Sequence, residues 1–367
     1  METVSGLVAN GLYRDALSML RAGAEAQSLC GLEREAILAQ LLQKTGDSHA
    51  ASARARRLLR AGSISDCAKI RCLTAIGEAM RDAGNTQQAV SHLQRAFTLA
   101  TNDGKVNEAC WAALPLMLAL FEGPGPEAAL AFIPYVRRTV VRAGDPLATA
   151  ALHIFVAEIE AKRGLVSAAA EHLRIGRNVL SEEPNAWLRG SAAVGASCLG
   201  YLLSDLPTAR TEALLALRHG EESGHRGVRR AALANLGHIE LAEGNFSGAE
   251  EFLREALRLS PDAGEAQRGV LDGLAQVALE QGLPTEAERL LNDVAGWSAE
   301  APKGTWYYGL WSCVTRGRLL INRGCFSEAA ELLRAAVAGA ERQTDVSLTT
   351  SLRLLQAEAL VHTGRHA

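Results

Sequence analysis

The sequence predicts an all-α protein built from repeated pairs of helices, and three observations lead to that prediction. A turn residue, usually Gly, is followed five positions later by Ala in the clear copies of a motif that recurs nine times. Apolar residues around each turn keep the i, i+3, i+4, i+7 spacing of a helix face. No stretch shows the sustained alternation of a strand. The marker alanines are Ala16, Ala51, Ala89, Ala129, Ala169, Ala209, Ala249, Ala287 and Ala329.

These alanines are 35 to 42 residues apart, a period typical of repeat proteins. Each unit is predicted to contain two antiparallel helices around its turn. In the seventh copy, Leu233, Leu236 and Gly237 share one face before the turn, and Ala249 and Leu253 share one after it. Small residues at fixed positions let two helices pack closely, and Gly followed by Asn or Asp supplies the turn between them.

The string from Leu233 to Pro261 resembles the tetratricopeptide repeat, which has small residues at its two helix-crossing positions. The resemblance covers nearly the whole chain and is strongest in the third, seventh and ninth copies. The period exceeds the usual repeat of about 34 residues. It is similar to that of a longer-helix subgroup found in kinesin light chains and bacterial regulators. The resemblance implies a right-handed superhelical solenoid of antiparallel helix pairs.

The fourth copy fits the repeat least well. Pro115 and Pro134 are expected to interrupt its two helices, since proline removes a backbone donor, and a Gly-Pro-Gly-Pro turn at 123–126 replaces the usual one. We expect residues 1–367 to form one solenoid of about nine repeats. An unpaired helix at 348–362 follows them. That helix is either a polar cap or the start of a further unit in a longer protein with an output domain downstream.

Composition excludes several classes of protein. The chain has 38 Lys and Arg against 41 Asp and Glu, a net charge of −3, so we expect no direct contact with nucleic acid. Seven scattered cysteines indicate neither a disulfide framework nor a zinc site. The N-terminus has no signal-peptide pattern, and the longest apolar run, 109–121, is shorter than the roughly 20 residues that span a bilayer. We therefore expect a cytoplasmic protein without membrane contact.

No pattern in the sequence indicates catalysis. The phosphate-binding motifs GxxxxGK[ST] and GxGxxG and the zinc motif HExxH are missing from it. The glycines of 123–126 lack the Lys and Ser or Thr of a phosphate loop, and 195–200 lies within a predicted helix rather than at a nucleophile elbow. We expect no enzyme activity, no metal and no cofactor.

Stacked helix pairs leave a concave groove lined by the first helix of each unit. Alignment on the marker alanines, a cluster of aromatic residues and, for Asn235, comparison with carboxylate-binding grooves give the candidate binding residues. They are Trp111, Leu114, Leu118, Phe121, Glu158, Asn235, His238, Gln276, Trp306, Tyr307, Trp311 and Arg318. The segment 109–121 is apolar on all sides, so it is either buried or presents an apolar strip to the groove. The aromatic cluster, Trp297, Trp306, Tyr307, Tyr308 and Trp311, is typical of binding hot spots but equally of helix packing.

Two other binding modes are not favoured. Some tetratricopeptide grooves hold a terminal carboxylate with a set of Lys, Arg and Asn, and here only Asn235 matches that set. A basic cluster at 218–230 contains Glu221 and Glu222 and is interpreted as a solvated edge rather than a phosphate site.

The sequence thus predicts a scaffold that binds a protein or peptide in its groove. By resemblance, it is expected to be the sensor or regulatory segment of a bacterial signalling or transcription-regulating protein. Two alternatives remain open, a free-standing adaptor without an output domain and a regulatory segment attached to a protease-like or phosphatase domain. The sequence does not indicate the oligomeric state.

Overall fold

The computed structural model describes residues 3–23, 31–62, 64–260, 264–293, 306–343 and 345–364, and these contain helices and no strands. The first helices of successive pairs are α1 (Val4–Ala9), α3 (Gly31–Thr45), α5 (Asp66–Asp82), α7 (Val106–Glu122), α9 (Pro146–Lys162), α11 (Ala186–Leu202), α13 (Arg226–Ala242), α15 (Glu265–Glu280) and α17 (Trp306–Asn322). The second helices are α2 (Tyr13–Arg21), α4 (Ser48–Ala61), α6 (Thr86–Asn102), α8 (Pro126–Ala143), α10 (Val166–Glu182), α12 (Leu206–Ser223), α14 (Phe246–Arg258), α16 (Pro284–Asp293) and α18 (Phe326–Arg342). Helix α19 (Val346–His362) packs on α18.

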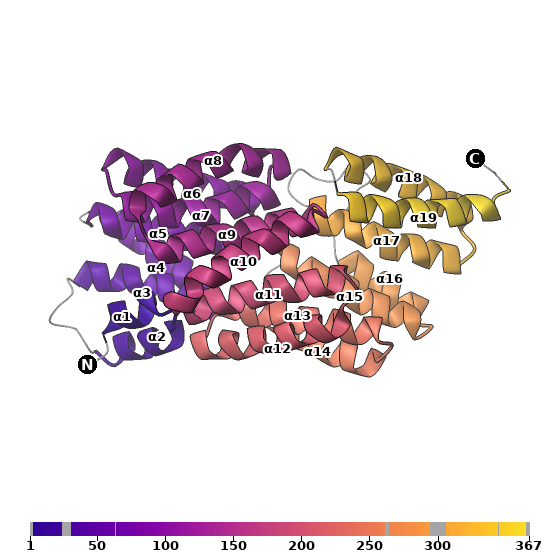
Figure 1. Ribbon diagram of the computed structural model, residues 1–367, viewed down its shortest axis with the longest axis horizontal. Helices are drawn as coiled ribbons and strands as arrows, with labels where there is room; N and C mark the ends of the chain where they lie inside the picture. Colours follow the sequence, from indigo (N-terminus) through magenta and orange to yellow (C-terminus); the bar gives the residue numbers. More distant parts are fainter. Residues whose placement is uncertain are drawn as a thin grey trace.

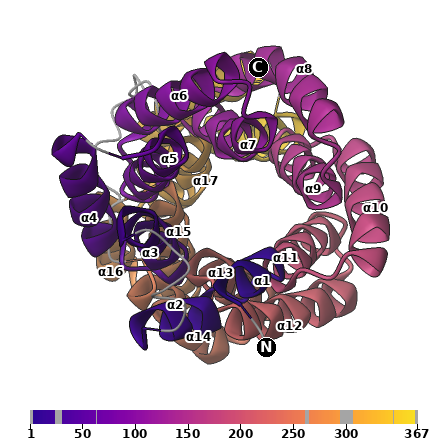
Figure 2. The same ribbon diagram turned by 90° about the vertical axis from the view of Figure 1, so that its left-hand side faces the viewer.

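The helix pairs wind into a right-handed superhelix, which confirms the predicted fold class. Figure 1 shows the helices running roughly along the length of an elongated molecule, with the two termini at opposite ends. In the end-on view of Figure 2, α3, α5, α7, α9 and α11 surround an open centre, and α4, α6, α8, α10 and α12 lie outside them.

The repeated small residues hold the two helices of a pair together. All nine marker alanines are 0% exposed, so each lies where helices cross and where a larger side chain would separate them. Gly237 in α13 shows the same closeness. A Cβ on that residue would lie 2.6 Å from Cγ of Leu253 in α14, well inside van der Waals contact. The regular spacing of the marker alanines in the sequence therefore reflects the positions at which the two helices of each pair cross.

Each turn ends one helix and caps the next. Gly84 and Gly244 adopt left-handed φ values of 74° and 79°, which glycine tolerates because it has no Cβ. The side chains of the following residues, Asn85 and Asn245, then accept hydrogen bonds from backbone amides in the first turns of α6 and α14. This Gly-Asn pair is the turn that the sequence motif predicts.

Ser204 occupies the left-handed position in the turn between α11 and α12, with φ 60°, and among the described residues it is the one non-glycine with positive φ. A left-handed conformation costs a residue with a Cβ about 1 kcal/mol. We expect Ser204→Gly to increase the free energy of unfolding by about that amount, measured by urea denaturation. The matched variant Gly244→Ser should lower it, because the added Cβ meets no atom within 4 Å and only the backbone strain changes. Equal stabilities for all three proteins would contradict this reading.

The expected interruption of the fourth unit is wrong. Helices α7 and α8 are continuous, with Pro115 and Pro134 inside them. Pro115 lies among fully buried neighbours, Leu114 and Leu116, on a helix that is apolar on nearly all sides. The burial of this surface outweighs the hydrogen bond that proline removes.

Successive turns of the superhelix touch. Asn185 Nδ2 donates to the Ala9 carbonyl at 2.8 Å, and the Ala186 amide donates to the Asn10 carbonyl at 2.9 Å, so the start of α11 is bonded to the end of α1. Further along, a Cβ on Gly164 after α9 would lie 3.5 Å from the backbone nitrogen of Ser347 in α19. The first turn is therefore closed by contacts between residues far apart in sequence.

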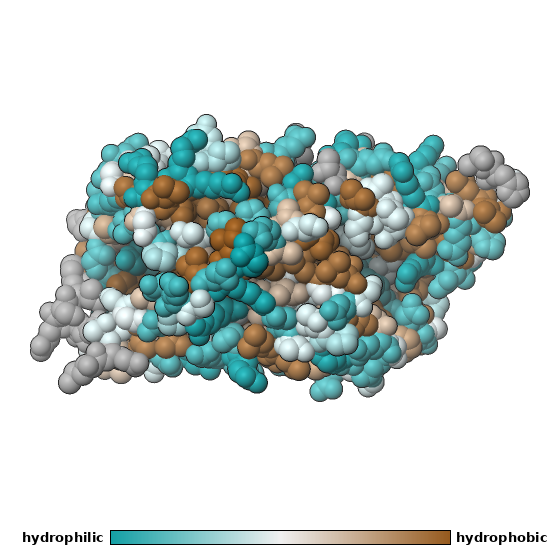
Figure 3. Space-filling view, in the orientation of Figure 1, coloured by the Kyte–Doolittle hydropathy of each residue, from teal (hydrophilic) through white to brown (hydrophobic). Residues whose placement is uncertain are grey.

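The outer surface mixes hydrophilic and hydrophobic residues on the face that Figure 3 shows. Among the described residues, no helix combines the length and apolar character needed to cross a bilayer.

Candidate functional site

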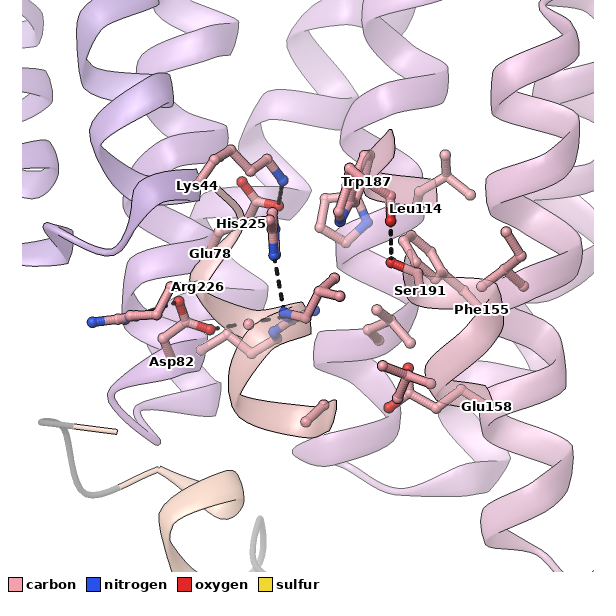
Figure 4. A pocket seen from close by; sticks show the side chains of 18 of the residues that line it. Lys44, Glu78, Asp82, Leu114, Phe155, Glu158, Trp187, Ser191, His225 and Arg226 are labelled. Atoms are coloured by element: carbon pink, nitrogen blue, oxygen red, sulfur yellow. Dashed lines mark hydrogen bonds and ion pairs between the residues drawn. The ribbon is translucent and has the colours of Figure 1, made fainter. Parts of the chain in front are cut away.

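The superhelix encloses a cavity of about 750 Å³. Its lining comes from the first helices α1, α3, α5, α7, α9, α11, α13, α15 and α17, with one contribution from α2. Pockets of this size bind small molecules or parts of peptides. Figure 4 shows its side chains, with Trp187, Leu114 and Phe155 on one side and Lys44, Glu78, Asp82 and Arg226 on the other.

An aromatic cluster forms the apolar wall of the cavity. The ring centroid of Trp187 in α11 lies 6.3 Å from that of Trp111 in α7 and 6.1 Å from that of Phe155 in α9. The imidazole of His225 stacks on Trp187 at 5.5 Å with 22° between the rings. Trp111 is held by its indole N–H, which donates to Asp145 at 2.9 Å. Because these rings come from different helices, the wall exists only when several units are wound together.

The lining also contains charged groups, and most of them are paired. Their ion pairs are Lys44–Glu78 at 2.6 Å, Arg81–Glu122 at 3.6 Å, Lys162–Glu158 at 2.7 Å and Arg226–Asp82 at 3.7 Å. Burial raises the pKa of Glu122. Burial also opposes ionisation of Glu158, but Lys162 holds the pKa of that carboxyl below its usual range. A ligand in this cavity therefore meets fixed charges of both signs beside an apolar wall.

His225 begins α13 at the edge of the cavity. Its Nδ1 accepts a hydrogen bond from the Val228 amide at 3.2 Å, so the ring caps the helix in its neutral form. Burial, together with the cations Lys44 and Arg230, places the pKa of His225 well below its usual value. The imidazole therefore stays neutral near pH 7 and serves as part of the aromatic wall.

Arg226 joins two turns of the superhelix at the cavity. Its guanidinium donates to the Gly46 carbonyl at 2.6 Å and to the Ser48 hydroxyl at 3.1 Å, and it also pairs with Asp82 in α5. These partners lie about 180 or 144 positions away in sequence, which makes Arg226 a long-range crosslink.

We expect Arg226→Met to lower the free energy of unfolding by about 1–3 kcal/mol, because it leaves the Gly46 carbonyl and Asp82 without this charged donor. Urea denaturation followed by circular dichroism measures the change. The control, Arg174→Met, removes an exposed pair with Glu171 and should change stability by less than about 0.5 kcal/mol. An Arg226→Met protein as stable as this control would show that the turns are held together by other contacts.

The structure places six of the twelve candidate residues in the lining of the cavity. They are Trp111, Leu114, Leu118, Glu158, Asn235 and His238. The Asn235 side chain donates to the Val194 carbonyl at 3.2 Å, and burial lowers the pKa of His238 to about 4.

Five other candidates lie outside this lining. Phe121 is 1% exposed and belongs to the core, and Gln276 bonds Asp272 at 2.9 Å. Tyr307 and Trp311 are half-buried against each other, 6.5 Å between ring centroids, and Arg318 is exposed near Glu280. The side chain of Trp306, the remaining candidate, and all of Trp297 lie outside the described residues.

The interpretation of the basic cluster as a solvated edge is wrong for its second half. His225, Arg226 and Arg230 line the cavity, since the turn before α13 lies against the first superhelical turn. Sequence reasoning also missed Trp187. A signal for it was present, because Trp187, Ser191, Val194, Gly195 and Cys198 recur on one face of α11, and all five line the cavity.

No group of three or more His, Cys, Asp or Glu side chains in the described ranges is arranged to hold a metal ion. The cavity offers a ligand an aromatic wall, charged groups of both signs and polar side chains, which are features of a binding site.

Comparison with known proteins shows what this chain is similar to. Residues 240–303 match the tetratricopeptide repeat family. No curated protein matches the sequence. The chain is similar to a solved Rap protein complexed with competence and sporulation factor, with a TM-score of 0.57 and 11% identity over 99% of this chain and 97% of that one.

A second similar structure is the APC/C hetero-tetramer Cut9–Hcn1, with a TM-score of 0.58 and 16% identity over 79% of this chain. The match spans 51% of that chain, about half its length. The predicted resemblance to the tetratricopeptide repeat superfamily is thereby confirmed. Membership of the longer-repeat subgroup stays a prediction.

Proposed function

Because the chain has the fold of a tetratricopeptide repeat superhelix, we propose that it binds a peptide or an extended protein segment inside the cavity of the superhelix. This cavity is called the channel from here on. The observation that carries this proposal is the cavity of about 750 Å³, lined by first helices from both turns and combining an aromatic wall with charged groups. An extended peptide presents apolar and polar side chains together, which suits such a lining. The solved Rap protein, which this chain matches over 97% of its length, is complexed with competence and sporulation factor. By analogy, we propose that this chain also binds its ligand within the superhelix.

The proposed role is that of a sensor or regulatory segment in a cytoplasmic bacterial signalling or transcription-regulating protein, with binding rather than catalysis as its activity. Occupancy of the channel would act on the contacts between turns, such as those of Asn185 with Ala9 and of Arg226 with Gly46. A ligand shifts the pitch of the superhelix only to the extent that it binds one shape better than the other. Groups that line the channel and also join its turns, such as Arg226, are where such a difference would arise.

A pull-down from cell lysate, with bound proteins and peptides identified by mass spectrometry, tests the proposal. We expect wild type to retain a peptide or protein that is not retained by Ala231→Trp, a variant in which a bulky side chain fills the channel. Retention of the same species by both proteins would contradict binding in the channel.

A further inference from the structure

The outer surface of α8 carries a stripe of arginines and exposed apolar side chains. Tyr135 is 55% exposed and Val141 is 80% exposed. At 3.6 residues per turn, Arg138 lies between them on the exposed face, with Arg137 and Arg142 on its two sides. We call these five residues the α8 patch. Helix α8 lies on the outside of the superhelix in Figure 2 and contributes nothing to the lining of the channel, so the patch is a separate surface.

The tyrosine of the α8 patch is held in place by a series of aromatic rings. Phe97 in α6 meets Phe132 in α8 edge to face, with 5.5 Å between the ring centroids. Phe132 in turn stacks on Tyr135 at 6.2 Å, with 18° between the rings. On the ring of Tyr135 lies the guanidinium of Arg138, 4.6 Å from the centroid. Because the Tyr135 ring is already ordered, a partner that binds it loses little side-chain entropy.

The arginines of the α8 patch have no carboxylate to pair with. None of the three forms an ion pair with a residue in the described ranges of the chain. Glu127, in the first turn, is the one acidic residue of α8, and the neighbouring helix α6 contains none. On the other side, Glu171 of α10 is already paired with Arg174 at 2.7 Å. Since the net charge of the whole chain is −3, this concentration of unpaired cations is a local feature.

Two half-buried histidines on the neighbouring outer helices lie among these and other arginines. Burial, together with Arg137, lowers the pKa of His172 in α10. Burial, together with Arg95 and Arg56, lowers the pKa of His92 in α6. The electrostatic potential over this side of the superhelix is therefore positive, which attracts an acidic partner and speeds its association.

The composition of the α8 patch favours a protein as the partner. Arg and Tyr are enriched in protein interfaces and in their hot spots, whereas Lys, which is depleted there, does not occur in the patch. The patch spans two helical turns, about 11 Å. Three cations over this length can contact only a few phosphates of a nucleic acid. One tyrosine and one valine offer a bilayer little apolar area. A short helix with apolar side chains between carboxylates fits both the length and the charge.

We propose that the α8 patch is a second binding surface, which docks an acidic amphipathic helix of a partner protein. The carboxylates of that helix would pair with Arg137, Arg138 and Arg142, and its apolar side chains would pack on Tyr135 and Val141. This goes beyond the ligand of the channel, because the patch lies on the outside of the superhelix. A segment that senses a ligand in its channel needs a further contact through which it acts on another protein, and the α8 patch supplies one.

The test selects binders from a phage-displayed library of helical peptides with randomised surface positions, with the purified full chain as bait. We expect the selected peptides to be enriched in Asp and Glu beside apolar residues. Synthetic copies should bind wild type at least about tenfold more tightly than Tyr135→Ala or Arg138→Gln, measured by fluorescence anisotropy at physiological salt. Tyr135→Ala changes no charge, so its loss of binding separates docking on the patch from attraction by the positive potential alone.

Two control variants complete the design. Arg258→Gln removes an exposed charge from the outer helix α14, and Ala231→Trp fills the channel, and both should bind the selected peptides as wild type does. Tyr135 and Arg138 are exposed, so their variants should melt at the temperature of wild type.

Other results would overturn the inference. Selection of no peptide, selection without acidic enrichment, or equal affinity for wild type and both α8 variants would contradict docking on the patch. Peptides lost only by Ala231→Trp would support the proposed function and leave the α8 patch without a role. Tighter binding of phosphatidylserine vesicles or duplex DNA than of any selected peptide, abolished by Arg138→Gln, would assign the patch to a membrane or a nucleic acid instead.

Discussion

Replacing Ala231 with Trp is expected to abolish ligand binding while the protein stays folded. Ala231 is half-buried on the face of α13 that lines the cavity and belongs to no buried cluster, so the larger side chain extends into the space that a ligand needs. We expect the dissociation constant of any ligand found by the pull-down to rise at least about 100-fold, or ~3 kcal/mol. The melting temperature should change by no more than about 3 °C. Fluorescence titration and thermal denaturation measure the two quantities.

The matched control places the same residue on the outside. Ala131 is exposed on α8, away from the cavity lining, so Ala131→Trp should bind ligand as wild type does. Loss of binding in both variants would indicate a nonspecific effect of the added Trp. Full binding by Ala231→Trp would place the ligand outside the channel.

Replacing Phe121 with Ala is expected to reduce stability strongly. Phe121 is 1% exposed near the end of α7, within the large apolar cluster that joins the first turn, and the Lys162 ammonium lies 5.6 Å from its ring. Deleting a buried Phe side chain leaves a cavity and costs about 3–5 kcal/mol. Urea denaturation followed by circular dichroism measures the loss.

The conservative variant separates packing from other effects. Phe121→Leu keeps most of the volume and should cost less than about 1.5 kcal/mol. If Phe121→Ala were as stable as wild type and instead lost ligand, Phe121 would belong to the groove, as the alignment of repeats suggested, and not to the core.

The fold could be predicted because each unit is stabilised locally. The turn glycine, its Asn or Asp cap and the marker alanine lie within six positions of one another, so their pattern survives in the sequence. Ser204 fits this pattern because its backbone adopts the glycine conformation, with φ 60°. The continuity of α7 and α8 through Pro115 and Pro134 was not predictable, because packing against neighbouring helices overrides the local effect of proline.

The site was less predictable, since it depends on how far the superhelix turns in each unit. Alignment of repeats identified the inward face of single helices, and for that reason five candidate residues lie in the lining, namely Trp111, Leu114, Leu118, Glu158 and His238. It could not show that the turn before α13 lies against Gly46 and Asp82, which brings Arg226 and Arg230 into the channel. Small rotations per repeat add up over five helix pairs, and no local pattern encodes their sum.

Hydrogen exchange tests whether a ligand binds inside the channel. Amide exchange of the full chain is compared with and without a peptide recovered by the pull-down, because bound segments open less often. We expect slower exchange in the first helices that line the cavity, above all α7, α11 and α13, with little change in outer helices such as α8 and α12. Protection confined to outer helices, or none at saturating peptide, would contradict it.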